Sequence, residues 1–201
     1  TEGIGLTEAV ADVTAFYRGL GIPPRLYHLV RPGEGRPLRG ALADAGYSFS
    51  DEDTRFFVRC GSSQITPLPA VQVERVTSLS PDLALMVERS GSMRARRILE
   101  RRVRSAAYHL LVASVNGRPV AVASLQEMGG LSRVDDVRTD VGERGKGYGR
   151  ALIHHLVRYH SEVMAGTLYL YADNPTAIRI YLEAGFVEME PGPAFWSAWL
   201  E

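Results

Sequence analysis

Residues 135–150 constrain the fold of this chain more than any other stretch. The sequence there reads DDVRTDVGERGKGYGR: it starts like a β-strand, breaks into a glycine-rich turn and continues as an amphipathic helix. Gly145, Gly147 and Gly149 leave no side chain between the backbone and a ligand. The first N–H groups of a helix lack intrahelical partners and lie at the positive end of the helix dipole. The stretch therefore predicts a backbone site for an anion such as a diphosphate.

Three basic side chains surround this turn, Arg144, Lys146 and Arg150, and they would add mobile positive charge to the fixed dipoles. The pattern also fits an ordinary helix start with a solvated basic face. Two common nucleotide motifs do not fit. A Walker A loop needs a lysine after Gly147, where Tyr148 stands, and the dinucleotide fingerprint needs its third glycine one residue later than the sequence provides it.

The turn resembles the R/Q-x-x-G-x-G/A signature of the GNAT superfamily of N-acetyltransferases. A second block follows at the separation that the family shows: a strand-like segment at 168–171 precedes N-x-x-A-x-x-x-Y-x-x-x-G-F, which is formed by Asn174, Ala177, Tyr181, Gly185 and Phe186. Two separate motifs in the right order are more specific than either alone. The resemblance implies an acetyl-CoA-dependent N-acetyltransferase with an α/β (α+β) GNAT fold, in which helices flank a mixed central sheet.

By this resemblance the co-substrate is acetyl-CoA, whose pyrophosphate would bind at the glycine turn. The strand end around Thr139 and Val141 would receive the acetyl group and the pantetheine arm through its backbone. The other residues expected to bind acetyl-CoA are Arg144, Gly145, Lys146, Gly147, Tyr148, Gly149, Arg150, Asn174, Ala177 and Tyr181.

Tyr181 is the expected general acid. In the family a tyrosine at this place of the motif protonates the CoA sulfur, a role that suits a phenol because it stays protonated at neutral pH. Spacing alone favours a different interpretation, in which Tyr181 is a core aromatic beside Ile178 and Leu182 on one helix face. The surrounding motif favours the catalytic role.

Asp135 and Asp136 are the candidates for a general base, since the family often carries an acidic residue on the strand before the turn. Their side chains should point to opposite faces, because side chains alternate along a strand, so at most one can face the acceptor. Arg133 stands where some members carry a catalytic Glu. A water relay or solvent alone is therefore an alternative to a carboxylate base. Either Asp could instead bind a cationic acceptor.

The sequence predicts a domain boundary near Val71. Residues 61–70 contain two prolines and no periodic pattern, which is typical of a linker. In the catalytic domain, 71–201, the pattern predicts strands at 71–76, 109–114, 119–125, 133–139 and 167–171, helical segments at 82–104, 148–162 and 175–184, and two closing strands. This order is that of the GNAT fold, and we expect the active site to lie wholly within this domain.

Residues 1–60 resemble the second half of such a domain. Aligned with the chain itself, Gly3–Ala9 matches 145–151, Leu26-Tyr27 matches 168–169, and Asp44–Tyr47 matches 183–186. The residues that would bind a diphosphate are not retained, since Glu2 occupies the position of Arg144 in this alignment and would repel a diphosphate. The sequence therefore predicts a degenerate, structural half-repeat with helices at 7–19 and 36–45. Chance matching of helix–strand–helix patterns is the alternative.

Such a half-domain would lack the four strands that precede the turn in the family, so its sheet would end in an unpaired edge. We expect it to pack within the chain as a monomer. A homodimer, or a natural chain that extends before Thr1, are the alternatives.

Composition excludes several classes of function. The 23 basic and 23 acidic residues balance, and no polybasic tail indicates a nucleic acid partner. The apolar runs are too short to cross a membrane and the first residues do not form a secretion signal, so we expect a cytoplasmic protein. The five histidines show no metal-ligand spacing, and no metal is expected. The single Cys60 lies outside every motif, which favours direct transfer over an acyl-enzyme.

Six arginines crowd residues 94–104 around Ile98, Leu99 and Val103. Most of them fit the solvated face of an amphipathic helix, and an anionic acceptor or partner is the alternative. The predicted function is transfer of an acetyl group to a primary amine of an unidentified acceptor. A non-catalytic acetyl-CoA-binding or interaction module is the alternative.

Overall fold

A computed structural model describes residues 5–30, 35–66, 68, 70–190 and 194–200. The chain divides into two compact units. Unit 1 consists of Thr1–Phe56 and Met189–Glu201, and unit 2 consists of Phe57–Glu188. No described helix has the length and apolar character that crossing a membrane would require.

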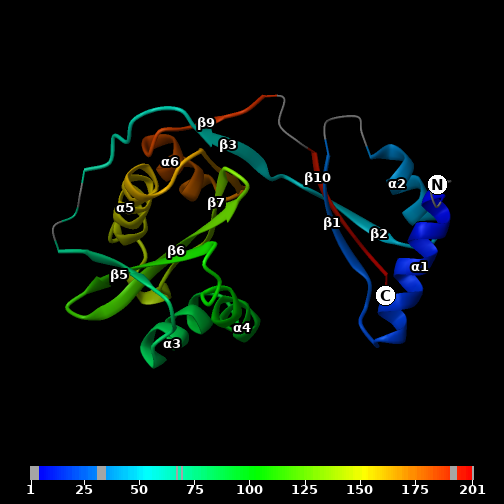
Figure 1. The fold of residues 1–201 in the computed structure, drawn as a ribbon, viewed down its shortest axis with the longest axis horizontal. Coiled ribbons are helices and arrows are strands. Elements are labelled where there is room, and N and C mark those ends of the chain that lie inside the picture. Colours follow the sequence, from blue (N-terminus) through cyan, green and yellow to red (C-terminus); the bar gives the residue numbers. More distant parts are fainter. Residues whose placement is uncertain (1–4, 31–34, 67, 69, 191–193, 201) are drawn as a thin grey trace. The chain divides into compact units, whose positions relative to one another are not determined.

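Unit 2 is built on a seven-stranded sheet with the order β4-β5-β6-β7-β8-β3-β9 (Figure 1). The strands β4 to β7 form an antiparallel meander, and β8 runs parallel to β7. The bounds of the strands are β3 Arg55–Arg59, β4 Gln72–Val76, β5 Tyr108–Val115, β6 Arg118–Met128, β7 Leu131–Thr139, β8 Thr167–Ala172 and β9 Phe186–Glu188. A tight hairpin turn at Asn116-Gly117 joins β5 to β6, and both residues have the positive φ that such a turn needs.

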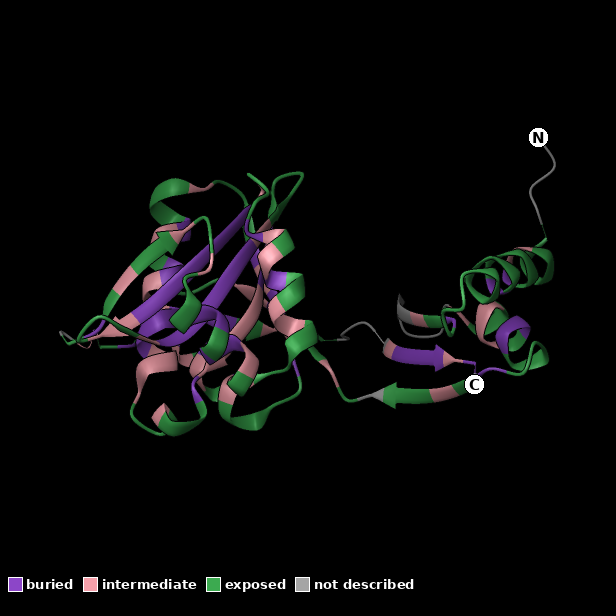
Figure 2. Ribbon diagram, turned by 90° about the horizontal axis from the view of Figure 1, so that it is seen from below, coloured by how far each residue is buried: buried purple, intermediate pink, exposed green. Residues whose placement is uncertain are grey.

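Helices cover both faces of this sheet. On one face, α5 (Tyr148–Val163) and α6 (Pro175–Glu183) bury a cluster that includes Leu111 and Leu156. On the other face, α3 (Pro81–Ser90) and α4 (Met93–Arg102) bury a cluster that includes Leu110 and Met86. Because side chains alternate along β5, its successive leucines enter different cores. The buried strands lie between the more exposed helices in Figure 2.

The two parallel strands of this sheet pair only at their beginnings. The register joins Leu131–Arg133 of β7 to Thr167–Tyr169 of β8, and no later pair joins the two strands among the described residues. Further along β7, its register with β6 shifts, and Asp136 takes a φ of +51°. A β-bulge of this kind bends a strand and turns it away from its neighbour. The ends of β7 and β8 therefore separate where each leads into its helix.

Unit 1 has a smaller sheet of three strands in the order β1-β10-β2, with β10 antiparallel to both neighbours. Its elements are α1 (Leu6–Gly19), β1 (Arg25–Val30), α2 (Arg36–Asp44), β2 (Ser48–Glu52) and β10 (Ala194–Trp199). The core of the unit joins Val10 and Leu42 of the helices to Trp196 of β10. The hydroxyl groups of Thr14 and Tyr47 share a buried hydrogen bond of 2.7 Å.

The division of the chain differs from the predicted boundaries. The last strand, β10, was expected to close the catalytic sheet, but it is the central strand of unit 1. In exchange, β3 from the first 60 residues lies between β8 and β9 in unit 2. The physical reason is packing, because Trp196 and Ala198 are buried in the unit 1 core while Phe57 is fully buried in the unit 2 core. Unit 1 therefore completes its sheet with β10 in the centre, and β1 and β2 are the edge strands of that sheet.

The expected linker is also part of unit 2. The N–H groups of Cys60 and Gly61 donate to the carbonyl of Gly185 over 3.1 and 3.0 Å, and that of Gln64 donates to Glu183 over 2.7 Å. Ile65 is 4% exposed within the core. Residues 60–65 are thus fixed against the end of α6. Pro67 and Pro69, which supported the linker prediction, lie outside the described residues.

The element order α-β-α-β-β occurs twice, as α1-β1-α2-β2-β3 and as α5-β8-α6-β9-β10. The helices predicted at 7–19 and 36–45 are confirmed within a residue by α1 and α2. Descent from a duplicated half-domain stays a prediction. Glu2, which carried the comparison with Arg144, lies outside the described residues.

Candidate active site

A cleft with a volume of 620 Å³ opens in unit 2 where the ends of β7 and β8 separate. It is bounded by the end of β7, the glycine turn, the first two turns of α5 and the inner side of α6. Most of the predicted acetyl-CoA residues line it: Thr139, Arg144, Gly145, Gly147, Tyr148, Gly149, Arg150, Asn174, Ala177 and Tyr181. Val141 and Lys146, which were also predicted, do not line the cleft, and neither do Asp135 and Asp136.

The glycine turn needs its glycines for different reasons. Gly145 and Gly147 have φ of +80° and +81°, a conformation that other residues adopt at a cost. Gly149 has an ordinary backbone, but an added Cβ would lie 2.8 Å from Thr139 Oγ1. Its missing side chain therefore allows α5 to approach β7, and the residue also lines the cleft.

The start of α5 is open to an anion. Gly147 is the N-cap residue and provides no side chain to accept a hydrogen bond from the first N–H groups of the helix. Those groups, with the helix dipole, form a site that favours negative charge. Of the nearby cations, Arg144 is exposed and has no carboxylate partner among the residues that the structure describes.

The other two cations of the turn are already paired. Lys146 Nζ lies 2.7 Å from Glu143 Oε2, and Arg150 Nε lies 2.6 Å from Glu183 Oε2. Both pairs are partly solvated, and such exposed pairs contribute about 0–1 kcal/mol, so an incoming phosphate could replace the carboxylate at little cost. Arg144 needs no such exchange.

Asn174 fixes the beginning of α6. Its Oδ1 accepts hydrogen bonds from the N–H groups of Thr176 and Ala177 over 2.9 and 3.1 Å. This is an N-cap, which satisfies two N–H groups that the helix leaves free. The cap sets the start of the helix that carries Ala177 and Tyr181 to the cleft.

Tyr181 belongs both to the core and to the cleft. Its side chain is 6% exposed, and its ring meets the edge of Phe186 at a centroid distance of 5.9 Å. Burial, with a smaller contribution from the charge of Asp135, raises the pKa of Tyr181 to about 12. The two interpretations of its spacing are therefore compatible, since one side of the ring packs in the core while the residue lines the cleft.

The prediction that Asp135 and Asp136 point to opposite faces is wrong. One atom, Arg102 Nη1, lies 3.1 Å from Asp135 Oδ2 and 3.2 Å from Asp136 Oδ2, so both carboxylates reach the same side of β7. The bulge explains this, because the positive φ of Asp136 interrupts the alternation of side chains.

Both carboxylates are also engaged by other groups. Arg133 Nη2 lies 2.7 Å from Asp135 Oδ2, and the hydroxyl of Tyr108 donates to Asp136 Oδ2 over 2.6 Å. Burial, with the charge of Asp136, raises the pKa of Tyr108, which stays protonated. Both carboxylates are thus occupied by ion pairs or hydrogen bonds and lie outside the cleft lining, so their positions do not suit a general base.

Sequence reasoning missed several residues of the cleft. Arg138 on β7 and Ser90 at the end of α3 line it, together with Val137, Glu143, Ile153, Thr176 and Ile180. Arg138 precedes Thr139 and could have been found as a strand neighbour. Ser90 is far away in the sequence, and only the packing of α3 against the sheet brings it there. Among the described residues, no group of His, Cys, Asp or Glu could hold a metal.

Comparisons with known proteins agree with this geometry. The model of the Acetyltransferase (GNAT) family matches residues 76–186. A GCN5-related N-acetyltransferase from Kribbella flavida is similar at 14% identity with a TM-score of 0.69, covering 98% of this chain and 77% of that one. Another from Sphaerobacter thermophilus is similar at 16% identity with a TM-score of 0.61, covering 98% and 68%.

A tandem GNAT protein from the clavulanic acid biosynthesis pathway is similar at 14% identity with a TM-score of 0.62, covering 94% of this chain and 68% of that one. These structural likenesses establish the fold, which is the predicted mixed α/β GNAT fold. A search of curated proteins gives no match.

Proposed function

This chain belongs to the GNAT acetyltransferase family, and we propose that it transfers an acetyl group from acetyl-CoA to a primary amine by direct attack in a ternary complex. One observation carries the proposal: a cleft at the separated ends of β7 and β8 has the uncapped start of α5 at its edge. A ligand with a diphosphate at one part and a thioester at another would fit these two features.

The residues of the turn suit the pyrophosphate of acetyl-CoA. The N–H groups at the start of α5 supply fixed dipoles, and Arg144 supplies a cation with no described carboxylate partner. The edge of β7 that faces β8 is unpaired beyond Arg133 in the described structure, so its backbone can bind the pantetheine arm. Acetyl-CoA brings the activated acyl group.

In the proposed reaction the amine nitrogen attacks the thioester carbon. The new N–C bond forms, the C–S bond breaks, and the sulfur leaves with the electron pair. The amine loses one proton to water, and the sulfur gains one. Tyr181, with a pKa of about 12, is protonated and donates a hydrogen bond to the sulfur as its charge develops. A thiol has a pKa of about 8.5, so complete transfer from Tyr181 is uphill and solvent supplies the final proton.

The amine has to arrive uncharged, because a protonated nitrogen has no electron pair to donate. The paired state of Asp135 and Asp136 favours solvent, and not a carboxylate, as the group that receives the proton. In this proposal both residues shape β7, and neither touches the reacting atoms.

The test is to incubate the protein with acetyl-CoA and a panel of amines, and to measure CoA thiol and acetylated product together. We expect equal amounts of both with at least one class of amine. Tight binding of acetyl-CoA by calorimetry without turnover of any amine would instead support the non-catalytic module, which the paired carboxylates favour.

For unit 1 we propose a structural role as a degenerate half-repeat. The recurrence of the α-β-α-β-β order supports this, as does the likeness to a tandem GNAT protein. The glycine turn has no counterpart with the same chemistry there, because Thr7 stands where Gly149 would be needed.

A further inference from the structure

The helix α4 carries a row of exposed arginines that no described acidic group neutralises. Arg94, Arg97 and Arg101 are three and four residues apart, a spacing that places them on one helical face. Arg104 follows in the turn after the helix. We call these four residues the arginine stripe. All four are exposed, and none forms an ion pair within the part of the chain that the structure describes.

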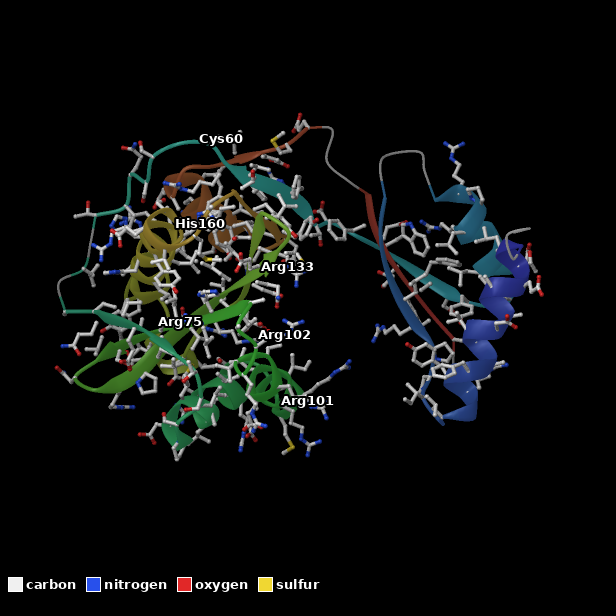
Figure 3. All side chains as sticks on the ribbon, in the orientation of Figure 1. Cys60, Arg75, Arg101, Arg102, Arg133 and His160 are labelled. Carbon is white, nitrogen blue, oxygen red and sulfur yellow. The ribbon has the colours of Figure 1, made fainter. Side chains whose placement is uncertain are left out.

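The segment from Gly91 to Arg102, which contains the helix that carries the stripe, contacts β7 at both of its ends, and the contact at Gly91 is next to the cleft. Before its first turn, Gly91 lies against the guanidinium of Arg138, which lines the cleft. At its last residue, Arg102 reaches the two aspartates of the β7 bulge. Figure 3 shows Arg101 and Arg102 on α4 and Arg133 on β7. The stripe therefore lies on a helix that is held against β7, with one end of the segment next to the cleft.

The carboxylates of this region do not balance the stripe. Five of them pair with three arginines outside the stripe: Glu88 and Glu100 pair with Arg96, Asp135 and Asp136 with Arg102, and Asp140 with Arg89. Arg138 and the stripe are left without a described partner. The whole chain has a formal net charge of zero, yet this region carries an excess of positive charge. Such a surface favours an anionic partner.

The size and surroundings of the stripe favour a polypeptide. Its ten-residue span corresponds to about 15 Å along a helix, which is longer than a small amine. The exposed apolar residues of α3 and α4 are Leu85, Met93 and Ile98. They can contact aliphatic side chains, but they offer no aromatic ring on which a nucleic acid base could stack.

The chemistry of the cleft selects the kind of amine. Because the cleft offers no free carboxylate as a base, a fraction of the acceptor amine must already be uncharged in solution. At pH 7.5 about a third of α-amines are neutral but only about one lysine side chain in a thousand, from their usual pKa values. Nearby arginines lower the pKa of a bound amine further. An N-terminal α-amine is therefore the better nucleophile here.

We infer that the acceptor is the N-terminal α-amine of an acidic polypeptide segment, whose carboxylates bind the arginine stripe. The inference rests on the proposed acetyl transfer. The α-amine nitrogen bonds to the acetyl carbon, the thioester C–S bond breaks with its electron pair on sulfur, one proton passes from the amine to water, and one reaches the sulfur.

The test compares four peptides of equal length with the full chain and acetyl-CoA. Three have a free N-terminus and acidic, neutral or basic residues after it. The fourth is acidic, with a blocked N-terminus and one lysine. We expect kcat/KM for the acidic peptide to exceed that for the neutral one by about fivefold or more, as expected for two or more new exposed ion pairs. The blocked peptide should not react.

The variant Arg97→Glu/Arg101→Glu should raise the KM for the acidic peptide by roughly tenfold or more. Its affinity for acetyl-CoA, measured by calorimetry, should match that of the unmodified chain. The matched control is Arg18→Glu/Arg36→Glu, which makes the same change in net charge at exposed positions of unit 1 and should leave the KM unchanged. Thermal unfolding of both variants verifies that they fold.

Equal kcat/KM values for the acidic, neutral and basic peptides would overturn the inference, and so would acetylation of the lysine in the blocked peptide. Either result would leave the proposed acetyl transfer intact. An RNA oligonucleotide that binds the stripe while peptides show no charge preference would also overturn the inference. Failure to bind acetyl-CoA at all would refute the proposed function, and the inference with it.

Discussion

Asp136 determines the geometry of the site at the scale of single residues. Its φ of +51° is unusual for a residue with a side chain, and the bonds from Tyr108 and Arg102 to its carboxylate hold it there. This bulge could not be predicted from the residue types, since an Asp-Asp pair fits a regular strand. Asp does tolerate the left-handed region better than most residues, which is the only local hint. The error about the two carboxylates followed from assuming regular alternation.

Substitutions at Asp136 should separate the backbone effect from the loss of charge. Asp136→Gly removes the carboxylate but suits the positive φ, whereas Asp136→Val removes the carboxylate and adds a β-branched side chain that resists this conformation. We expect the valine variant to be less stable than the glycine variant by about 1–2 kcal/mol in denaturant unfolding. Equal stabilities would show that the bulge is not held in this conformation.

Tyr181→Phe tests the role of the hydroxyl. The ring should keep its place against Phe186, so acetyl-CoA affinity should change by no more than a few-fold while kcat falls by ~10²-fold. In the unmodified protein the pKa of about 12 keeps Tyr181 protonated, so kcat/KM should rise as the acceptor amine loses its proton and show no fall up to pH 10. An unchanged kcat in the variant would limit Tyr181 to packing.

At the scale of elements, the glycine turn and the helix that follows it could be predicted because the sequence patterns that indicate them are local. The predicted segments 148–162 and 175–184 correspond to α5 and α6 within a residue. The sequence could not show that β3 joins the sheet of unit 2 and β10 that of unit 1, since both are short strands with apolar residues. Which sheet each one joins is decided by contacts with residues far away in the sequence, such as those of Phe57 and Trp196 in their separate cores.

Gly147→Asp should abolish acetyl-CoA binding. The new carboxylate would compete with a diphosphate for the first N–H groups of α5. Its Cβ has space, with Leu68 as the nearest atom at 3.7 Å, and the φ of +81° adds a backbone strain that Asp tolerates better than most residues. Gly142→Asp is the matched control, because it adds the same charge to the same loop at a position that is open and outside the cleft. Arg144→Ala should weaken binding without abolishing it. Calorimetry that finds the two aspartate variants alike would refute the anion site.

At the scale of the whole molecule, the bounds of the two units differ from those that the sequence suggested. Unit 1 consists of two separate segments, and unit 2 is the continuous segment Phe57–Glu188. The chain passes between units near residues 56–57 and 188–189. A boundary near Val71 would remove β3 and Ile65 from the core of unit 2. Composition and motif spacing could not reveal this, because the residues before Val71 carry no catalytic signature and contribute only packing.

Two fragments of the chain test this division. The fragment 57–188 retains Phe57–Arg59 of β3, which pair with β9, and the entire cleft, and it should fold and bind acetyl-CoA. The fragment 71–188 loses the fully buried Phe57 and the nearly buried Ile65. Removing such core side chains costs about 2–5 kcal/mol each, so this fragment should unfold at a much lower temperature. Similar thermal stabilities of the two would contradict the assignment of β3 to unit 2.

The central claim is that the cleft beside α5 transfers an acetyl group from acetyl-CoA to an amine. Its most direct test measures CoA thiol and acetylated amine in the same reaction, for the unmodified chain and for Gly147→Asp and Gly142→Asp. We predict one acetylated amine for each thiol released with the unmodified chain and with Gly142→Asp, and no release above hydrolysis with Gly147→Asp. Thiol release without an acetylated amine, or equal turnover by Gly147→Asp, would contradict the account.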